Sequence, residues 1–123
     1  MTLKYNQSGH CSATNEYELY SILDNITLGY INRKKQYLFD IGCIIDYYGL
    51  DPKTQLPVLI EVKNWFLKIK DMEQLIKYLI HATEKYGENN FHLKVIVGGI
   101  ENSRKKILDK LGIEVYLTKD LVK

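Results

Sequence analysis

Apolar residues recur every three or four positions in two stretches of the chain, the spacing that lines one face of a helix. The pattern predicts an amphipathic helix over residues 15–27, ended by Gly29, and another over residues 70–86, ended by Gly87. The face positions are Leu19, Ile22, Leu23 and Ile26 in the first helix, and Met72, Leu75, Ile76, Leu79 and Thr83 in the second.

Aromatic and β-branched residues between and after these helices predict strands. Residues 36–48 and the stretch PVLIEVKNWF at 57–66 form a predicted hairpin, joined by the turn-rich GLDPKTQLP, and residues 30–33 predict a strand before it. An apolar strand at 91–98, a helix at 102–111 and a strand at 113–118 follow. The order α-β-β-β-α-β plus a C-terminal helix and strand predicts an α/β fold, with a mixed central sheet and flanking helices.

Two charges stand inside the apolar stretch at 57–66. Side chains two apart on a strand share a face, so Glu61 and Lys63 lie on the side of Leu59. A charge in a core strand is costly unless it is paired or binds a metal. The two residues therefore form either a cross-strand ion-pair network on a half-exposed face or part of a site.

Asp40 interrupts the apolar run YLFDIGCII as Glu61 interrupts VLIEV, and the predicted hairpin can set the two side by side. Paired carboxylates suit Mg²⁺ or Mn²⁺. The Lys63 ammonium beside them would orient a water and stabilise charge on a phosphoryl oxygen. Asp46 shares a face with Asp40 and is the rival metal ligand; Asp40 is preferred because it lies further inside the strand.

The ordered set resembles the signature of the PD-(D/E)XK, or restriction-endonuclease-like, nuclease superfamily: an Asp, a gap and Glu-x-Lys, here Asp40 and the EVK at 61–63. It is most similar to the small Holliday-junction-resolvase-type branch, which Glu18 on the first helix and the pairs GY at 29–30 and NR at 32–33 match in order. Phe39 stands where the family has Pro or Glu, and the gap to Glu61 is longer than in compact members.

The resemblance implies an Mg²⁺-dependent DNA endonuclease, with Mn²⁺ as a substitute, that hydrolyses phosphodiester bonds, including those of branched or structured DNA, as a homodimer. Asp40, Glu61 and Glu18 would hold the metal, with Lys63 as a catalytic residue. Glu18 has an alternative role, because it stands three after Asn15 and can complete a helix capping box. The alternative functions are a catalytically inactive nucleic-acid-binding or assembly module on the same fold, and an RNA nuclease.

Gln74 and Tyr78 have the Gln-x-x-x-Tyr spacing of recombination-helicase nucleases, so the resemblance implies that Gln74 orients Lys63 or the water. With His81, they form a stripe beside the apolar face of the second helix, which a solvated flank explains equally well. His10, in the stretch SGHC, is either exposed or a substrate contact.

The composition of the chain limits its possible domain count, location and binding partners. The 123 residues predict one domain, 1–123, and a net charge of +2 permits nucleic acid without requiring it. No long apolar segment is present, which predicts a soluble cytoplasmic protein with Cys11 and Cys43 as reduced thiols. Basic clusters at 32–35, 68–70 and 103–106 are either solvated faces or phosphate contacts, and nothing in them indicates base-specific readout. The predicted DNA-binding residues are Arg33, Lys34, Lys35, Lys68, Lys70 and Tyr78.

Overall fold

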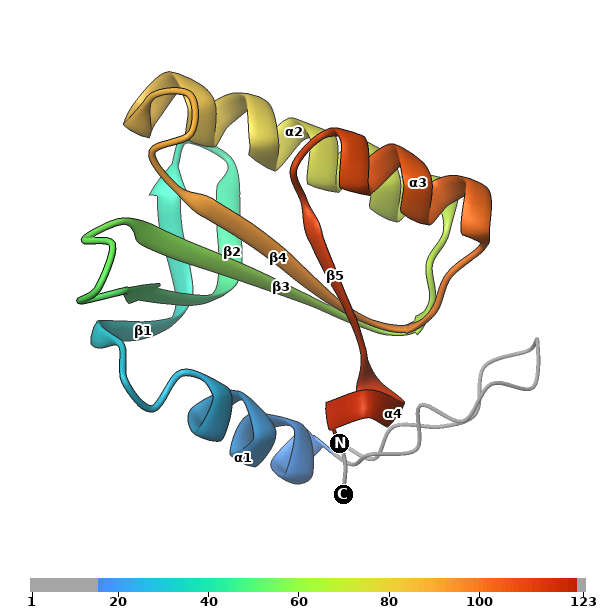
Figure 1. Cartoon of the computed structure of the whole chain (residues 1–123), viewed down its shortest axis with the longest axis horizontal. Coiled ribbons are helices and arrows are strands. Elements are labelled where there is room, and N and C mark those ends of the chain that lie inside the picture. The colour runs from blue at the N-terminus through green and yellow to red at the C-terminus, as the bar shows by residue number, and fades with distance from the viewer. Residues whose placement is uncertain (1–15, 122–123) are drawn as a thin grey trace.

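The chain forms a five-stranded mixed sheet with helices on both faces, as the sequence pattern predicts (Figure 1). The computed structural model describes residues 16–121, with side chains from residue 20 onward. The strands are β1 (Ile31–Asp40), β2 (Cys43–Leu50), β3 (Pro57–Phe66), β4 (His92–Gly99) and β5 (Glu114–Leu117). The helices are α1 (Glu16–Ile26), α2 (Ile69–Tyr86), α3 (Asn102–Lys110) and α4 (Thr118–Leu121), of which the pattern does not predict α4.

The strand order follows the chain, from β1 at one edge to β5 at the other. The strands β1, β2 and β3 pair antiparallel, whereas β3, β4 and β5 pair parallel. A parallel pair needs a crossover connection, and α2 and α3 supply the two crossovers. Both lie on one face of the sheet, and α1 and α4 lie on the other (Figure 1).

Strand β3 is buried on both sides and divides its side chains between two cores. Leu59 packs in the core beneath α2 and α3, whereas Val58 and Ile60 pack in the core beneath α1. The predicted division of this stretch between the two faces is therefore confirmed. By the same alternation, Glu61 and Lys63 extend from β3 on the α2 side.

The prediction of one strand over residues 36–48 is wrong, because the chain reverses inside that run. Asp40 pairs with Cys43, and its Oδ1 accepts a hydrogen bond from the Ile41 N–H at 2.8 Å. Gly42 has φ +72°, a left-handed conformation that glycine adopts without steric cost. The three-strand meander is present, but β1 and β2 meet where the sequence pattern predicts a strand interior.

The β1–β2 hairpin packs against α2 over the α2 side of the sheet. The Tyr78 hydroxyl donates a hydrogen bond to the Ile44 carbonyl at 2.9 Å, and the Lys77 ammonium donates to the Gly42 carbonyl at 3.1 Å. These bonds attach the far end of β2 to the helix rather than to β3. The β2–β3 pairing ends at Tyr47 and Ile60, and the candidate site lies where the two strands separate.

Candidate active site

Strands β2 and β3 separate at a fork, and two carboxylates bridge it. The β2–β3 pairing runs only as far as Tyr47 and Ile60, so Asp46 and Glu61 are the first residues beyond the last pair. The Asp46 N–H donates to Glu61 Oε1 at 3.3 Å, and the Val62 N–H donates to Asp46 Oδ2 at 2.8 Å. Each carboxylate thus satisfies a backbone donor that the diverging strands leave unpaired. These bonds place the two acids side by side.

Glu61 is buried, with 4% of its surface exposed. Burial, reinforced by the negative charge of Asp46, raises the pKa of Glu61 from 4.5 to about 8. Lys63 opposes this rise in the pKa, because its Nζ lies 3.2 Å from Glu61 Oε2. The fork therefore contains two acids and a single lysine that contacts Glu61.

The Lys63 side chain is only 13% exposed, so the ammonium is largely removed from water. A half-exposed ion-pair network, the alternative reading of Glu61 and Lys63, does not describe this environment. Exposed pairs contribute little and are easily rearranged, whereas a buried pair has a defined geometry. The lysine is held at the edge of the carboxylate pair.

The prediction that Asp40 lies beside Glu61 is wrong. Strand β2 lies between β1 and β3, so Asp40 at the end of β1 is not on a strand that neighbours Glu61. Its Oδ2 lies 2.9 Å from Nδ1 of His81 on α2, and this bond, with that from Ile41, lowers the pKa of Asp40. The rival residue Asp46 occupies the predicted place.

Gln36 is a site residue that the sequence does not reveal. Its Nε2 donates to Asp46 Oδ1 at 2.9 Å. The backbone of Gln36 has φ +50° within β1, a left-handed conformation that costs a side-chain-bearing residue energy. A glutamine on an exposed edge strand carries no signal in the sequence, because its partner is set by the register of β1 against β2.

Gln74 and Tyr78 lie beside the fork on α2. The Gln74 Nε2 donates to the Tyr78 hydroxyl at 3.0 Å. Tyr78 is 4% exposed, and burial followed by the charge of Glu61 raises its pKa. The Gln74 Oε1 is buried and accepts no hydrogen bond from the described residues. The solvated flank is therefore wrong for Tyr78, and Gln74 has an acceptor left for a further donor.

Other predicted residues lie outside the described part of the chain or away from the fork. Glu18 lies in α1, but its side chain is outside the described residues, as are His10 and Cys11. Cys43 is a buried free thiol. Arg104 of the third basic cluster donates to the Leu67 carbonyl at 2.7 Å, which is a structural contact.

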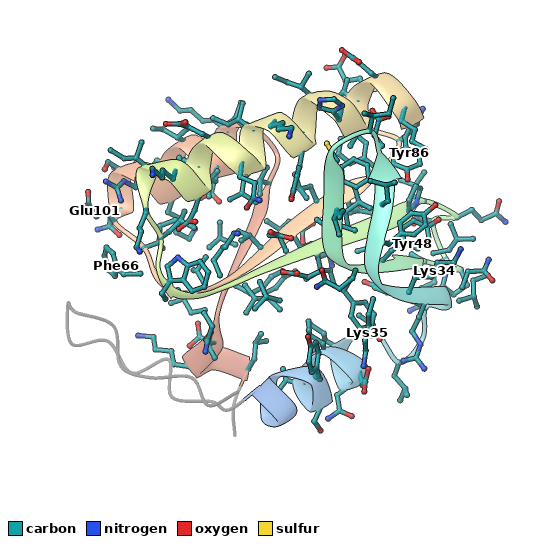
Figure 2. All side chains as sticks on the ribbon, turned by 180° about the vertical axis from the view of Figure 1, so that it is seen from behind. Lys34, Lys35, Tyr48, Phe66, Tyr86 and Glu101 are labelled. Carbon is teal, nitrogen blue, oxygen red and sulfur yellow. The ribbon has the colours of Figure 1, made fainter. Side chains whose placement is uncertain are left out.

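The first basic cluster borders a groove of about 530 Å³ between β1 and α1. Figure 2 shows Lys34 and Lys35 on the hairpin, and Lys35 Nζ lies 4.8 Å from the ring centroid of Tyr20 on α1. Lys68 and Lys70, at the start of α2, are exposed. The groove residues are Asp24, Asn25, Leu28, Arg33, Lys34, Lys35 and Tyr47.

The two carboxylates at the fork suit a hard divalent cation whose other oxygen ligands come from water and substrate. In the part of the chain with described side chains, no three His, Cys, Asp or Glu residues form a complete metal cage. Mg²⁺ commonly binds through one or two carboxylates, with water and substrate phosphate as the other ligands. Asp46 and Glu61 offer that donor set, and a cation between them would offset both the burial of Glu61 and the negative charge of Asp46, the two causes that raise the pKa of Glu61.

The chain shares its α/β fold with several solved structures. A repair endonuclease from Pyrococcus abyssi matches it with a TM-score of 0.68 and 22% identity, over 85% of this chain and 46% of that protein. EndoMS in complex with double-stranded DNA matches with a TM-score of 0.61 and 22% identity, over 80% and 41%. Can2 from Sulfobacillus thermosulfidooxidans, bound to cyclic tetra-adenylate, matches with a TM-score of 0.60 and 21% identity, over 81% and 30%.

These likenesses show the fold, and the chain spans less than half the length of each of the three structures. No protein-family model and no curated protein sequence matches the chain. Among the described helices, none is both long and apolar enough to cross a membrane.

Proposed function

We propose that the protein is a metal-dependent DNA endonuclease whose active site is the fork between β2 and β3. The observation that carries the proposal is the grouping of Asp46, Glu61 and Lys63, with Glu61 nearly fully buried yet paired with another acid. A buried carboxylate beside a second, half-buried one is a costly arrangement for folding alone, and a strongly perturbed group such as Glu61 is typical of functional sites. The fold shared with a repair endonuclease and with EndoMS, which is bound to double-stranded DNA in its structure, supports the same conclusion.

Asp46 and Glu61 hold Mg²⁺ or Mn²⁺ in this proposal, and Glu18 is a candidate for a further ligand. The bound cation supplies an acidified water and neutralises charge on the phosphate. In the reaction, a water oxygen bonds to phosphorus and that water gives up a proton to solvent, the bond from phosphorus to one sugar oxygen breaks, and that sugar oxygen takes a proton from solvent. Lys63 stabilises the negative charge that accumulates on the phosphoryl oxygens. Gln74 has a free acceptor with which to orient the attacking water.

The basic groove and the start of α2 bind the DNA backbone. Lysine and arginine side chains contact phosphates without reading sequence, so we expect strongly salt-dependent binding with little base preference. Branched or structured DNA is the proposed substrate class, and a homodimer would cut two strands with two copies of the site. The cations concerned are Arg33, Lys34, Lys35, Lys68 and Lys70.

A cleavage assay tests the function. The protein is incubated with Mn²⁺ or Mg²⁺ and with plasmid, single-stranded DNA, a four-way junction and RNA in parallel, with EDTA as the control. The proposal expects metal-dependent cleavage of DNA that Glu61→Gln and Lys63→Ala abolish. Cleavage of RNA alone would make the protein an RNA nuclease. Binding without any cleavage would make it an inactive binding or assembly module.

A further inference from the structure

We propose that Trp65 is a positioning residue that holds the Lys63 ammonium beside Glu61; this inference rests on the function proposed above. The register of β3 against β4 shifts between Lys63 and Phe66, but Trp65 still lies on the α2 side of β3, because its indole bonds to Asp71 of α2. The Lys63 Nζ lies 5.5 Å from the centroid of the Trp65 ring and 3.2 Å from Glu61 Oε2. The ammonium thus has an aromatic contact and an ionic contact.

Lys63 needs a partner other than Glu61 if it is to stay in place during the reaction. A lysine side chain has a flexible four-carbon stem, and its charge position is set only by what surrounds it. When Glu61 binds a cation, its oxygens are shared and its hold on the ammonium weakens. An aromatic ring attracts a cation through its quadrupole without carrying a charge. Trp65 can therefore hold the Lys63 ammonium in place whether or not Glu61 binds a cation.

The orientation of the Trp65 ring is itself fixed from α2. The indole Nε1 donates to Asp71 Oδ2 at 2.8 Å, and the backbone N–H of Lys68 donates to the same oxygen at 2.9 Å. Asp71 is buried in the first turn of α2. The Lys68 Nζ lies 6.0 Å from the ring centroid, so two ammonium groups already contact the ring. These contacts favour a positioning role over the stacking of a nucleobase.

The contact can be tested without any nuclease assay. The ring current of Trp65, the chain's single tryptophan, should move the Lys63 ε-CH₂ signals upfield in NMR spectra of the full chain. We expect Trp65→Leu to abolish this shift and Trp65→Phe to reduce it without abolishing it, because phenylalanine keeps a ring but loses the bond to Asp71. Tyr86→Leu is the matched control, because it removes a ring 5.9 Å from Lys85 Nζ at the far end of α2. Lys63 signals unchanged by Trp65→Leu would overturn the proposal.

Kinetics then separate positioning from substrate contact. Trp65→Leu should lower kcat about tenfold with KM for DNA unchanged, and Trp65→Phe should stay within about threefold of the unsubstituted protein. A raised KM with an unchanged kcat would assign Trp65 to DNA contact and overturn the positioning role. If the unsubstituted protein cleaves nothing, the proposed function fails. The NMR shift of the Lys63 signals tests the contact between Lys63 and Trp65 whether or not the protein cleaves DNA.

Discussion

Replacing Glu61 with glutamine should make the metal-free protein relatively more stable as the pH rises. The pKa of Glu61 is raised from 4.5 to about 8, so the folded protein binds this proton more tightly than the unfolded chain does. Protonated Glu61 therefore contributes stability that is fully present below about pH 4.5 and is lost as the pH rises toward 8. Glutamine has the same shape and does not titrate.

The size of the effect follows from the two pKa values. Between pH 4.5 and pH 7, the unfolded carboxyl loses its proton while most of the folded carboxyl keeps it, which costs the native state about 3 kcal/mol. The quantity to compare is the free energy of unfolding of Glu61→Gln minus that of the unsubstituted protein. This difference should grow by about 3 kcal/mol between pH 4.5 and pH 7. Comparing two pH values cancels effects of the substitution that do not depend on pH, such as a change in packing.

Denaturant unfolding in EDTA, followed by the fluorescence of the single tryptophan, measures both free energies at each pH. Asp109→Asn is a matched control. Asp109 lies on α3 and also pairs with a lysine, since its Oδ2 lies 2.9 Å from Lys105 Nζ, but its side chain is well exposed. This variant controls for the general effect of replacing a carboxylate with an amide. A Glu61→Gln difference that stays constant from pH 4.5 to 7 would refute the argument that Glu61 is a costly buried acid.

Three further predictions concern the site and its partner. Mn²⁺ should raise the Tm of the unsubstituted protein and of Asp40→Asn but not of Asp46→Asn; the reverse pattern would restore Asp40 as the metal ligand. Gln36→Ala should weaken Mn²⁺ binding by about tenfold in calorimetry, because an outer partner that orients a ligand usually contributes that much; unchanged affinity would leave its bond to Asp46 without a role. Replacing Lys34 and Lys35 together with alanine should lower the slope of log K against log salt for DNA binding by about 2, and an unchanged slope would remove the groove from the DNA path.

Much of the architecture is predictable from local patterns. The helical spacing of α2 and the apolar run of β4 place these elements within a residue or two of their observed bounds. The alternation along β3 correctly divides its side chains between the two faces. These features depend on short-range periodicity, which burial of one face or of both faces imposes on the sequence.

The hairpin was harder to predict, because its turn lies inside an apolar run. Asp40 and Gly42 are ordinary turn residues, but the apolar residues around them are equally typical of one long strand. A turn at residues 40–43 makes residues 43–50 the strand that pairs with β3. The register of that pairing places Asp46, rather than Asp40, beside Glu61. Counting along the sequence cannot separate Asp40 from Asp46, since they share a face of any single strand.

The sequence by itself therefore determined the α/β fold, the faces of its strands and the Glu61–Lys63 pair. Only the tertiary structure decided that β2 and β3 separate beyond the Tyr47–Ile60 pair, and that Asp46 stands at the resulting fork. It also decided that Gln36 contacts Asp46 and that Trp65 contacts Lys63. The physical reason is the range of the interactions. Periodicity acts between residues a few positions apart, whereas the fork is made by hydrogen bonds between strands that are distant along the chain.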